Sequence, residues 1–171
     1  AARVDPKVIR RDGNRVDLVF EIREGDLTEI ERIGFTDKTV ALDTAGNAGQ
    51  AYRLYEAAFD RTPDQGGLSY WVGRLDASVS LRDVAYGFVA SAEFRQIYGA
   101  NPTSVALVSK FYQNILDRPG EQAGIDYWVG KLNSGTALID VLAGFSEGAE
   151  NIAKVAPKIA GGILLDAWAL V

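Results

Sequence analysis

The sequence predicts an α+β fold that is mainly α, with an N-terminal β-hairpin segment followed by a duplicated helical bundle. Three observations lead to this prediction. Near the N-terminus, apolar and charged residues alternate with a period of two, which is typical of a half-buried strand. From about residue 47 the apolar period changes to 3.6, which is typical of amphipathic helices. A stretch of 36 residues then recurs 57 positions later, which indicates an internal duplication.

Residues 1–35 are expected to form a charged β-hairpin and strand segment. They hold 15 charged residues, against 26 in the remaining 136, and this change in composition marks a boundary near residue 36. The clearest strand signal is the apolar alternation at Val16, Leu18, Phe20 and Ile22. Asp12-Gly13-Asn14 predicts the hairpin turn before it, and residues 28–35 predict a third extended piece.

Residues 36–171 are expected to form the duplicated helical domain. Sixteen of 36 positions are identical between 59–94 and 116–151, which is too many for chance. The domain is expected to comprise a first repeat over about 47–100, a second over about 103–156, and a C-terminal helical tail over 157–171.

The first helix of each repeat is expected to end at an Asp-Arg dipeptide. The dipeptide is Asp60-Arg61 in the first copy and Asp117-Arg118 in the second. A Pro within the next two residues favours termination of the helix there. The Arg can bond the free carbonyl groups of the helix end and hold Asp83 or Asp140 nearby. We interpret both pairs as part of the structural core of the repeat, since no third polar residue recurs to complete a catalytic site.

The second helix of each repeat carries an apolar stripe that includes Trp71 in the first copy and Trp128 in the second. The stripe residues are Leu68, Trp71, Val72 and Leu75, repeated as Ile125, Trp128, Val129 and Leu132. This spacing favours core packing of both Trp side chains over an exposed stacking platform. Tyr70 and Tyr127 lie well off the stripe and are the candidate interaction residues.

Two pairs of glycines and a pair of Phe residues extend this core. Gly73 and Gly130 lie inside the second helix, where Gly costs about 1 kcal/mol relative to Ala, so we expect another helix backbone to approach them closely. The third helix places Phe88 and Phe145 in the core, each after a Gly. Ser80 with Asp83 predicts its start in the first copy.

Composition narrows the classes of function. The chain has no Cys and no His, so thiolate sites, the usual general base and the commonest zinc ligand are all missing, and we expect no enzyme. A net charge of −5 argues against nucleic-acid binding. The longest apolar stretch, 159–171, is too short to span a bilayer.

The repeat resembles the bacterial domain-of-unknown-function family numbered 4214 over about residues 36–160. The resemblance lies in a first-helix Tyr, Asp-Arg, Gly-(Leu/Ile)-x-Tyr-Trp, and Gly-Phe ahead of Ser-x-Glu-Phe. The second copy departs at its end, where "SEGAEN" (146–151) stands in place of "ASAEF". The resemblance implies a module of a large secreted or surface protein of the adhesin, S-layer or calcium-repeat type. It implies no catalytic residues and no cofactor, and calcium only as part of that setting.

Residues 1–35 are similar to strands of POTRA modules of the outer-membrane barrel assembly factor, which bind other strands by edge pairing. The leading expectation is a non-enzymatic structural or interaction module, extracellular or at the cell surface, that binds a protein partner or assembles with itself. One alternative is a periplasmic POTRA-like scaffold that binds β-strands. Another is a carbohydrate-binding module that uses Tyr70 and Tyr127.

Overall fold

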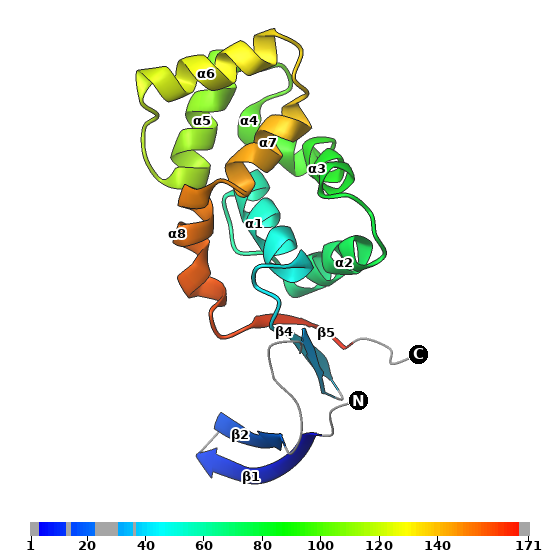
Figure 1. The fold of residues 1–171 in the computed structure, drawn as a ribbon. Coiled ribbons are helices and arrows are strands. Elements are labelled where there is room, and N and C mark those ends of the chain that lie inside the picture. The colour runs from blue at the N-terminus through cyan, green and yellow to red at the C-terminus, as the bar shows by residue number, and fades with distance from the viewer. Residues whose placement is uncertain (1–3, 13–14, 23–30, 36, 168–171) are drawn as a thin grey trace. The chain divides into compact units, whose positions relative to one another are not determined.

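A computed structural model describes residues 4–12, 15–22, 31–35 and 37–167 of the chain. The chain divides into two units, Ala1–Ile30 and Glu31–Val171. Over the described residues the fold is α+β and mainly α, as the sequence predicts. It comprises eight helices and five strands (Figure 1).

The first unit holds an antiparallel pair of strands, β1 (Val4–Asp12) and β2 (Arg15–Ile22). Asp12 lies opposite Arg15, which agrees with the predicted hairpin, while turn residues 13 and 14 lie outside the described part of the chain. The register shifts between Pro6 and Val8, where the proline has no N–H to donate to the ladder.

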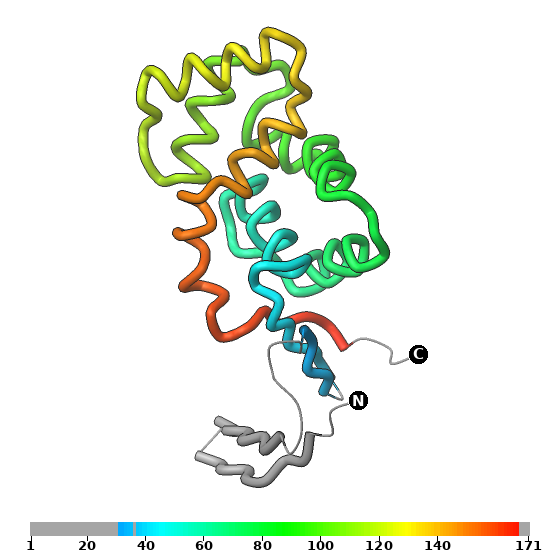
Figure 2. The backbone as a smooth tube through the Cα atoms, viewed as in Figure 1, coloured from blue at the N-terminus to red at the C-terminus, as the bar shows by residue number. Residues whose placement is uncertain are grey.

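The second unit begins with a small antiparallel sheet of β3 (Arg32–Gly34), β4 (Lys38–Ala41) and β5 (Ile163–Asp166), in that order. Figure 2 shows the two ends of this unit meeting, with β5 beside β4. Of the extended piece predicted over 28–35, residues 32–34 form β3 in the sheet of the helical unit, and residues 28–30 lie outside the described part of the chain. The predicted boundary near residue 36 is replaced by a division after Ile30.

The helical tail expected over 157–171 is wrong for most of its described part, residues 157–167, and residues 168–171 lie outside the described part of the chain. The last helix ends at Ile159, and Gly162 follows with φ +94°, a conformation that favours glycine and stops the helix. Over Ile163–Asp166 burial alternates, with Ile163 and Leu165 inside and the other two residues outside. This period of two is that of a strand with one face on the core.

Each repeat forms four helices in the same order. The first repeat comprises α1 (Asn47–Phe59), α2 (Gln65–Asp76), α3 (Leu81–Val89) and α4 (Ala92–Tyr98). The second comprises α5 (Ser104–Leu116), α6 (Gln122–Asn133), α7 (Leu138–Ser146) and α8 (Ala149–Ile159). The sequence predicted the first three of each set, while the fourth was not separated from the third.

Side-chain caps explain where several helices begin. Asp64 accepts a hydrogen bond from the Gly67 N–H at 2.7 Å and starts α2, and Ser80 accepts from the Asp83 N–H at 3.1 Å and starts α3. Thr103 starts α5 by accepting from the Ala106 N–H at 3.2 Å. Each cap satisfies a backbone donor that the first helical turn leaves free.

The two repeats share one hydrophobic core. Phe88 and Phe145 are almost fully buried, at 1% and 3% exposure, as predicted. The Phe111 ring lies edge-on to Tyr98 of the first repeat at 5.1 Å and to Phe145 of its own repeat at 5.4 Å. The chain of rings, together with the contact of α3 with α7, joins the repeats into one folding unit.

Candidate interaction surface

In the first repeat, a stack of three aromatic rings leads from the core to the surface. The Phe88 ring is buried, and the Trp71 ring lies tilted over it with 4.9 Å between centroids. Tyr70 lies edge-on to Trp71 at 4.9 Å and is 58% exposed. The outermost ring is therefore held by a rigid support and open to solvent on its other side.

The second repeat carries the same stack. Trp128 lies 5.0 Å from Phe145, and Tyr127 lies edge-on to Trp128 at 5.1 Å. Tyr127 is 56% exposed, and the Lys131 ammonium lies over its ring at 5.4 Å from the centroid. The predicted outward position of both Tyr residues is confirmed. The two Trp side chains are half-buried against the core, so they form the middle of each stack and are not enclosed on all sides.

Glycines on the third helix make room for each stack. A Cβ at Gly87 would lie 2.4 Å from Cη2 of Trp71, and one at Gly144 would lie 2.6 Å from Cη2 of Trp128. Both distances are far inside van der Waals contact, so any side chain there would displace the indole ring.

Gly73 and Gly130 have a different setting from the one predicted. A Cβ at either position would meet nothing within 4 Å, so no helix backbone approaches them and that expectation is wrong. Gly73 lies one turn from Tyr70 on α2, and Gly130 lies one turn from Tyr127 on α6. Each exposed Tyr is therefore flanked by helix backbone that no side chain covers.

Around Tyr70 the surface forms a shallow depression of about 510 Å³. Its lining includes Ser69, Gly73, Asp76 and Asp166. The Ser69 hydroxyl accepts a hydrogen bond from the Asp166 N–H at 2.8 Å, which attaches β5 to α2 at the edge of the depression.

The Asp-Arg pair of the first repeat holds the start of the fourth helix. Arg61 donates to Glu93 on α4, at 2.7 and 3.2 Å, and to the Tyr55 hydroxyl at 3.0 Å. The bonds to Glu93 raise the pKa of the Arg61 guanidinium. Tyr55 in turn donates to Asp64, and this bond lowers the pKa of that carboxyl. The cluster thus ties the start of α2 to α4.

The second repeat repeats the arrangement. Arg118 donates to Glu150 on α8 at 2.5 and 2.8 Å, and to Glu121 at 2.7 Å. The bond from Arg118 lowers the pKa of Glu150. Arg61 and Arg118 thus bond Glu93 and Glu150, whereas the sequence predicted Asp83 and Asp140. Asp83 instead accepts from the Ser80 hydroxyl at 2.6 Å, and Asp140 accepts from Arg82 at 2.8 Å.

The Asp of each pair ends the first helix through its backbone. Asp60 and Asp117 have φ 51° and 54°, a left-handed conformation that Asp adopts more readily than most residues. Both side chains are exposed, as is Arg61, and Arg118 is half-exposed. The four residues expected in the structural core of the repeat therefore lie at its surface, where they end one helix and hold another.

The departure of the second copy at 146–151 joins the two repeats. Glu147 binds Arg53 of α1 through two hydrogen bonds of 2.6 and 2.9 Å, and Arg53 is only 3% exposed. Asn151 is buried in place of the first copy's Phe94 and donates to the Ser146 carbonyl at 2.9 Å. Glu147 thus joins the second repeat to the first, whereas the Asn151 bond stays within the second repeat.

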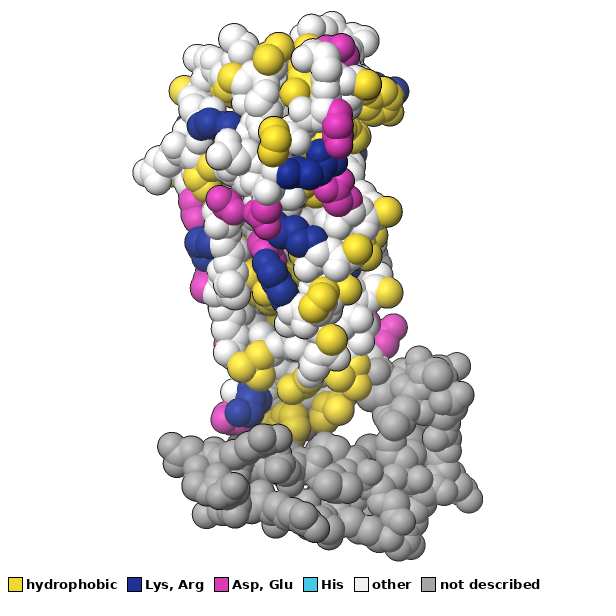
Figure 3. All heavy atoms as spheres, turned by 90° about the vertical axis from the view of Figure 1, so that its left-hand side faces the viewer, with side chains coloured by type: hydrophobic (Ala, Val, Ile, Leu, Met, Phe, Trp, Pro, Cys, Tyr) yellow, Lys and Arg dark blue, Asp and Glu magenta, His cyan; other side chains and the backbone are white. Residues whose placement is uncertain are grey.

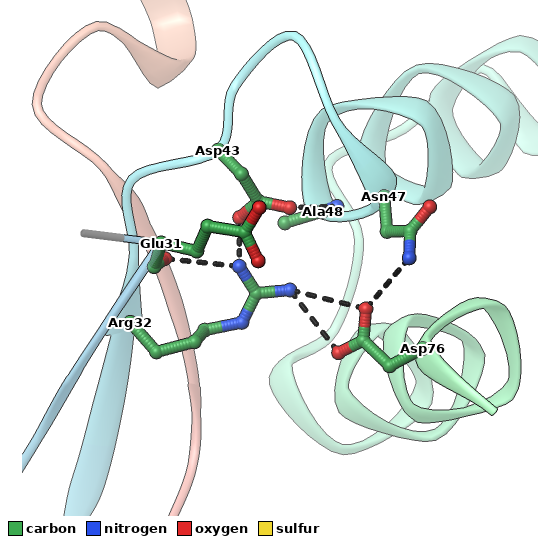
Figure 4. Close-up of polar contacts among 6 residues, drawn as sticks. All are labelled: Glu31, Arg32, Asp43, Asn47, Ala48 and Asp76. Atoms are coloured by element: carbon green, nitrogen blue, oxygen red, sulfur yellow. Dashed lines mark hydrogen bonds and ion pairs between the residues drawn. The ribbon is translucent and has the colours of Figure 1, made fainter. Parts of the chain in front are cut away.

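A further polar network attaches the sheet to the first repeat (Figure 4). Arg32 of β3 forms an ion pair with Asp43 and donates to Asp76 of α2 at 3.2 and 3.4 Å. Asp43 also accepts from the Ala48 N–H at 3.0 Å at the start of α1. The residues drawn in the close-up are Glu31, Arg32, Asp43, Asn47, Ala48 and Asp76. Their role is to fix the sheet on the ends of α1 and α2.

One face of the helical unit is of mixed charge (Figure 3). Figure 3 shows Lys and Arg side chains interspersed with Asp and Glu on one face of the helical unit. Among the described residues, no three His, Cys, Asp or Glu side chains gather where they could hold a metal ion. Of the helices in residues 37–167, none is both long and apolar enough to cross a membrane.

Comparison with known families gives two overlapping matches, at residues 43–96 and 85–155. Both are to a family model described as a domain of unknown function, DUF4214. Together they cover well over half of the chain and follow the two repeats in order. Neither match includes residues 1–35, and the POTRA resemblance expected there finds no support in these comparisons. Searches of curated proteins and of solved structures found no match.

Proposed function

The chain belongs to the family of the domain of unknown function DUF4214, and on that premise we propose that it is a non-enzymatic structural and interaction module of a bacterial secreted or cell-surface protein. The adhesin, S-layer or calcium-repeat setting is part of this proposal. The module acts by joining copies of its parent protein through the two surfaces centred on Tyr70 and Tyr127, which we call the tyrosine faces.

One observation carries the proposal: the same exposed ring, on the same rigid support, occurs twice on helices far apart in the unit. Figure 1 shows α2 near the sheet and α6 at the opposite end. Large amphipathic aromatic rings that are already immobilised lose little conformational entropy on binding. Two like faces at opposite ends give the module two points of attachment, as a connector requires.

The polar clusters of the described residues support a structural reading. Arg61 and Arg118 are fully engaged with the carboxylates of Glu93 and Glu150, and Arg53 with that of Glu147. Each cluster ties one helix to another. None of these groups is left in a cleft with the spare donor and acceptor capacity that an acid–base site needs.

The test is the molar mass of the chain by light scattering across a range of concentrations, with and without calcium. If tyrosine faces associate in pairs, the wild-type chain forms open assemblies that grow with concentration. Tyr70→Ser or Tyr127→Ser alone leaves one face and stops assembly at the dimer. The double variant is a monomer.

The matched control is Tyr86→Ser, which removes an exposed Tyr of 64% exposure that the second repeat does not share. This variant assembles like the wild type. A wild-type chain that stays monomeric in both conditions overturns the proposal, and so does a double variant that assembles normally. Dependence on calcium would place the module with calcium-dependent surface assemblies.

Carbohydrate binding is a second candidate, favoured by the depression around Tyr70. An exposed ring beside the hydroxyl of Ser69 and the carboxylates of Asp76 and Asp166 offers both stacking and hydrogen-bonding groups to a sugar. A glycan array is the direct test. Retention of the wild type but not of Tyr70→Ser would support this candidate, and no retention of either would exclude it.

A POTRA-like strand-binding scaffold is the third candidate, and it concerns only the first unit. β1 and β2 form a two-stranded sheet in the described residues, and a short sheet of this kind can pair with a further strand. Leu18 lies in the ladder opposite Ile9. Leu18→Pro should abolish strand binding, and binding that survives this change would exclude the candidate.

A further inference from the structure

The chain fills a groove in its own first repeat with its C-terminal segment. The groove runs between α1 and α2, and its lining includes Tyr52, Pro63 and Leu68. The end of α8 and the start of β5 lie against it and leave a space of about 240 Å³. Ile159 and Ile163 of this segment are buried, at 2% and 3% exposure, so the segment is part of the core there.

Polar contacts fix the same segment at both of its ends. At the helical end, Lys158 forms an ion pair with Glu56 of α1. At the strand end, the Gln65 side chain donates to the Asp166 carboxylate at 2.9 Å, and the Asp166 N–H donates to Ser69. Two aliphatic side chains four residues apart, on a helix end that turns through glycine into a strand, thus make up what this groove accepts.

The second repeat has the equivalent groove between α5 and α6, and the described residues leave it open. The space there is about 600 Å³. Its lining residues are Ser109, Gln113, Asp117, Arg118, Pro119, Gly120 and Ile125. Shifted by the repeat length of 57, they coincide with α1–α2 positions, among them Tyr52, Thr62, Pro63 and Leu68 of the first groove.

The second helices of the two repeats differ in burial. In α2, Leu68, Val72 and Leu75 of the predicted stripe are buried, whereas α6 has no buried residue. Ile125 and Val129 on α6 are aliphatic and have the same spacing as Leu68 and Val72, but they stay half-exposed. α6 therefore has an apolar face that the described residues do not fully bury.

The substitutions between the two grooves define the chemistry of an occupant. Ser109 stands where the first groove has Tyr52, which makes the second groove wider. Gln113 stands in place of Glu56, so the carboxylate that pairs with Lys158 is absent. The aliphatic position is kept as Ile125. A segment that enters here needs the two aliphatic side chains but not the lysine.

We propose that the groove between α5 and α6 is a docking site for a segment of a partner protein, a helix end that turns into a strand and presents two aliphatic side chains in the manner of Ile159 and Ile163. The segment of this chain that occupies the equivalent groove is the template for the occupant. The lining of this site does not include Tyr70 or Tyr127, so the docking proposal can be tested independently of the proposed assembly.

The probe is a fluorescently labelled synthetic peptide of residues 156–167, titrated with the full chain and followed by anisotropy. We expect saturable binding to the wild type, and weakening by about tenfold or more in Ile125→Glu, which puts a charge into the groove. Val105→Glu is the matched control. It makes a similar change at a residue of α5 that is 54% exposed and does not line the groove.

Three further reagents keep the test decisive. Ile125→Ser removes the aliphatic side chain from the groove without adding a charge and should also weaken binding. This variant keeps the test valid if circular dichroism shows that Ile125→Glu perturbs the fold. A peptide with Lys158→Ala should bind like the original, and one with Ile159→Ser and Ile163→Ser should not bind.

Three results overturn the proposal. The first is no binding of the original peptide to the wild type. The second is equal binding to all variants, which would mean that the peptide replaces the chain's own segment in the first groove. The third is loss of chain self-association in Ile125→Glu, which would make a second copy the occupant. Tyr70→Ser with Tyr127→Ser should leave peptide binding unchanged, which separates this site from the proposed function.

Discussion

Alanine substitution of four glycines tests the seating of the aromatic stacks. All four lie inside helices, so Ala gains about 1 kcal/mol of helix propensity at each. Gly73 and Gly130 face open space, whereas Gly87 and Gly144 lie against the indole rings of the stacks. The same chemical change therefore meets two different surroundings. Gly130 repeats the test of Gly73 in the second repeat, and Gly144 repeats that of Gly87.

The size of the difference follows from the distances. At Gly73 the new Cβ meets nothing within 4 Å, so Gly73→Ala should stabilise the fold by about 1 kcal/mol. At Gly87 the Cβ would lie 2.4 Å from Trp71, whose ring also packs on the buried Phe88. Overpacking of this kind costs about 1–3 kcal/mol. After the helix gain, Gly87→Ala should destabilise the fold by up to about 2 kcal/mol.

Urea unfolding followed by circular dichroism at a fixed protein concentration measures all four variants. Gly73→Ala and Gly130→Ala should raise the midpoint, and Gly87→Ala and Gly144→Ala should lower it, at an unchanged slope. In thermal unfolding, 1 kcal/mol corresponds to a shift of about 2–4 °C for a chain of this size. Equal shifts for Gly73→Ala and Gly87→Ala would refute the seating of Trp71 against α3.

Two further predictions concern the C-terminal strand and the Arg118 cluster. Leu165→Ala should lower the free energy of unfolding by about 2–5 kcal/mol, because Leu165 is fully buried. The adjacent Leu164→Ala should cost little, since Leu164 is 47% exposed. Equal costs in urea unfolding would contradict the alternating burial of β5. The pKa of Glu150 is lowered by Arg118, so the folded state binds this proton less readily than the unfolded state. The stability it adds is present above its ordinary pKa of 4.5 and is lost as the pH falls through the folded value. In urea unfolding at several pH values, Glu150→Gln should weaken acid destabilisation, and an unchanged pH profile would contradict the ion pair.

Helical periodicity and the internal repeat were sufficient to predict most of the second unit. The stripe through Leu68 and Val72 places α2 correctly because a helix with one apolar face has one way to bury it. The exposed position of Tyr70 followed from the same helical periodicity, which places it well off the apolar stripe. Because the sequence is duplicated, each helix pattern occurs twice, and agreement between the two copies supports a prediction that local propensity alone would leave open.

The failures have a common physical cause: they depend on contacts between residues distant in the chain. A run such as Ile163-Leu164-Leu165 is apolar enough for a helix or a strand, and only its pairing with β4 decides between them. The partner of Arg61 could not be read from spacing, because Glu93 reaches it through the packing of α4. The glycine at 73 was expected to contact a helix, but the sequence does not show which helical faces remain uncovered.

The three-stranded sheet also determines how the helical unit responds to a pulling force. The chain enters this sheet at Arg32, beside Ala41 of β4, and leaves it at Asp166, beside Lys38 at the other end of β4. Tension between these two points acts along the strands in opposite directions. The hydrogen bonds of both ladders then bear the load together and do not open one after another. The sheet is therefore loaded in shear, and it protects the helices when these two points are pulled apart.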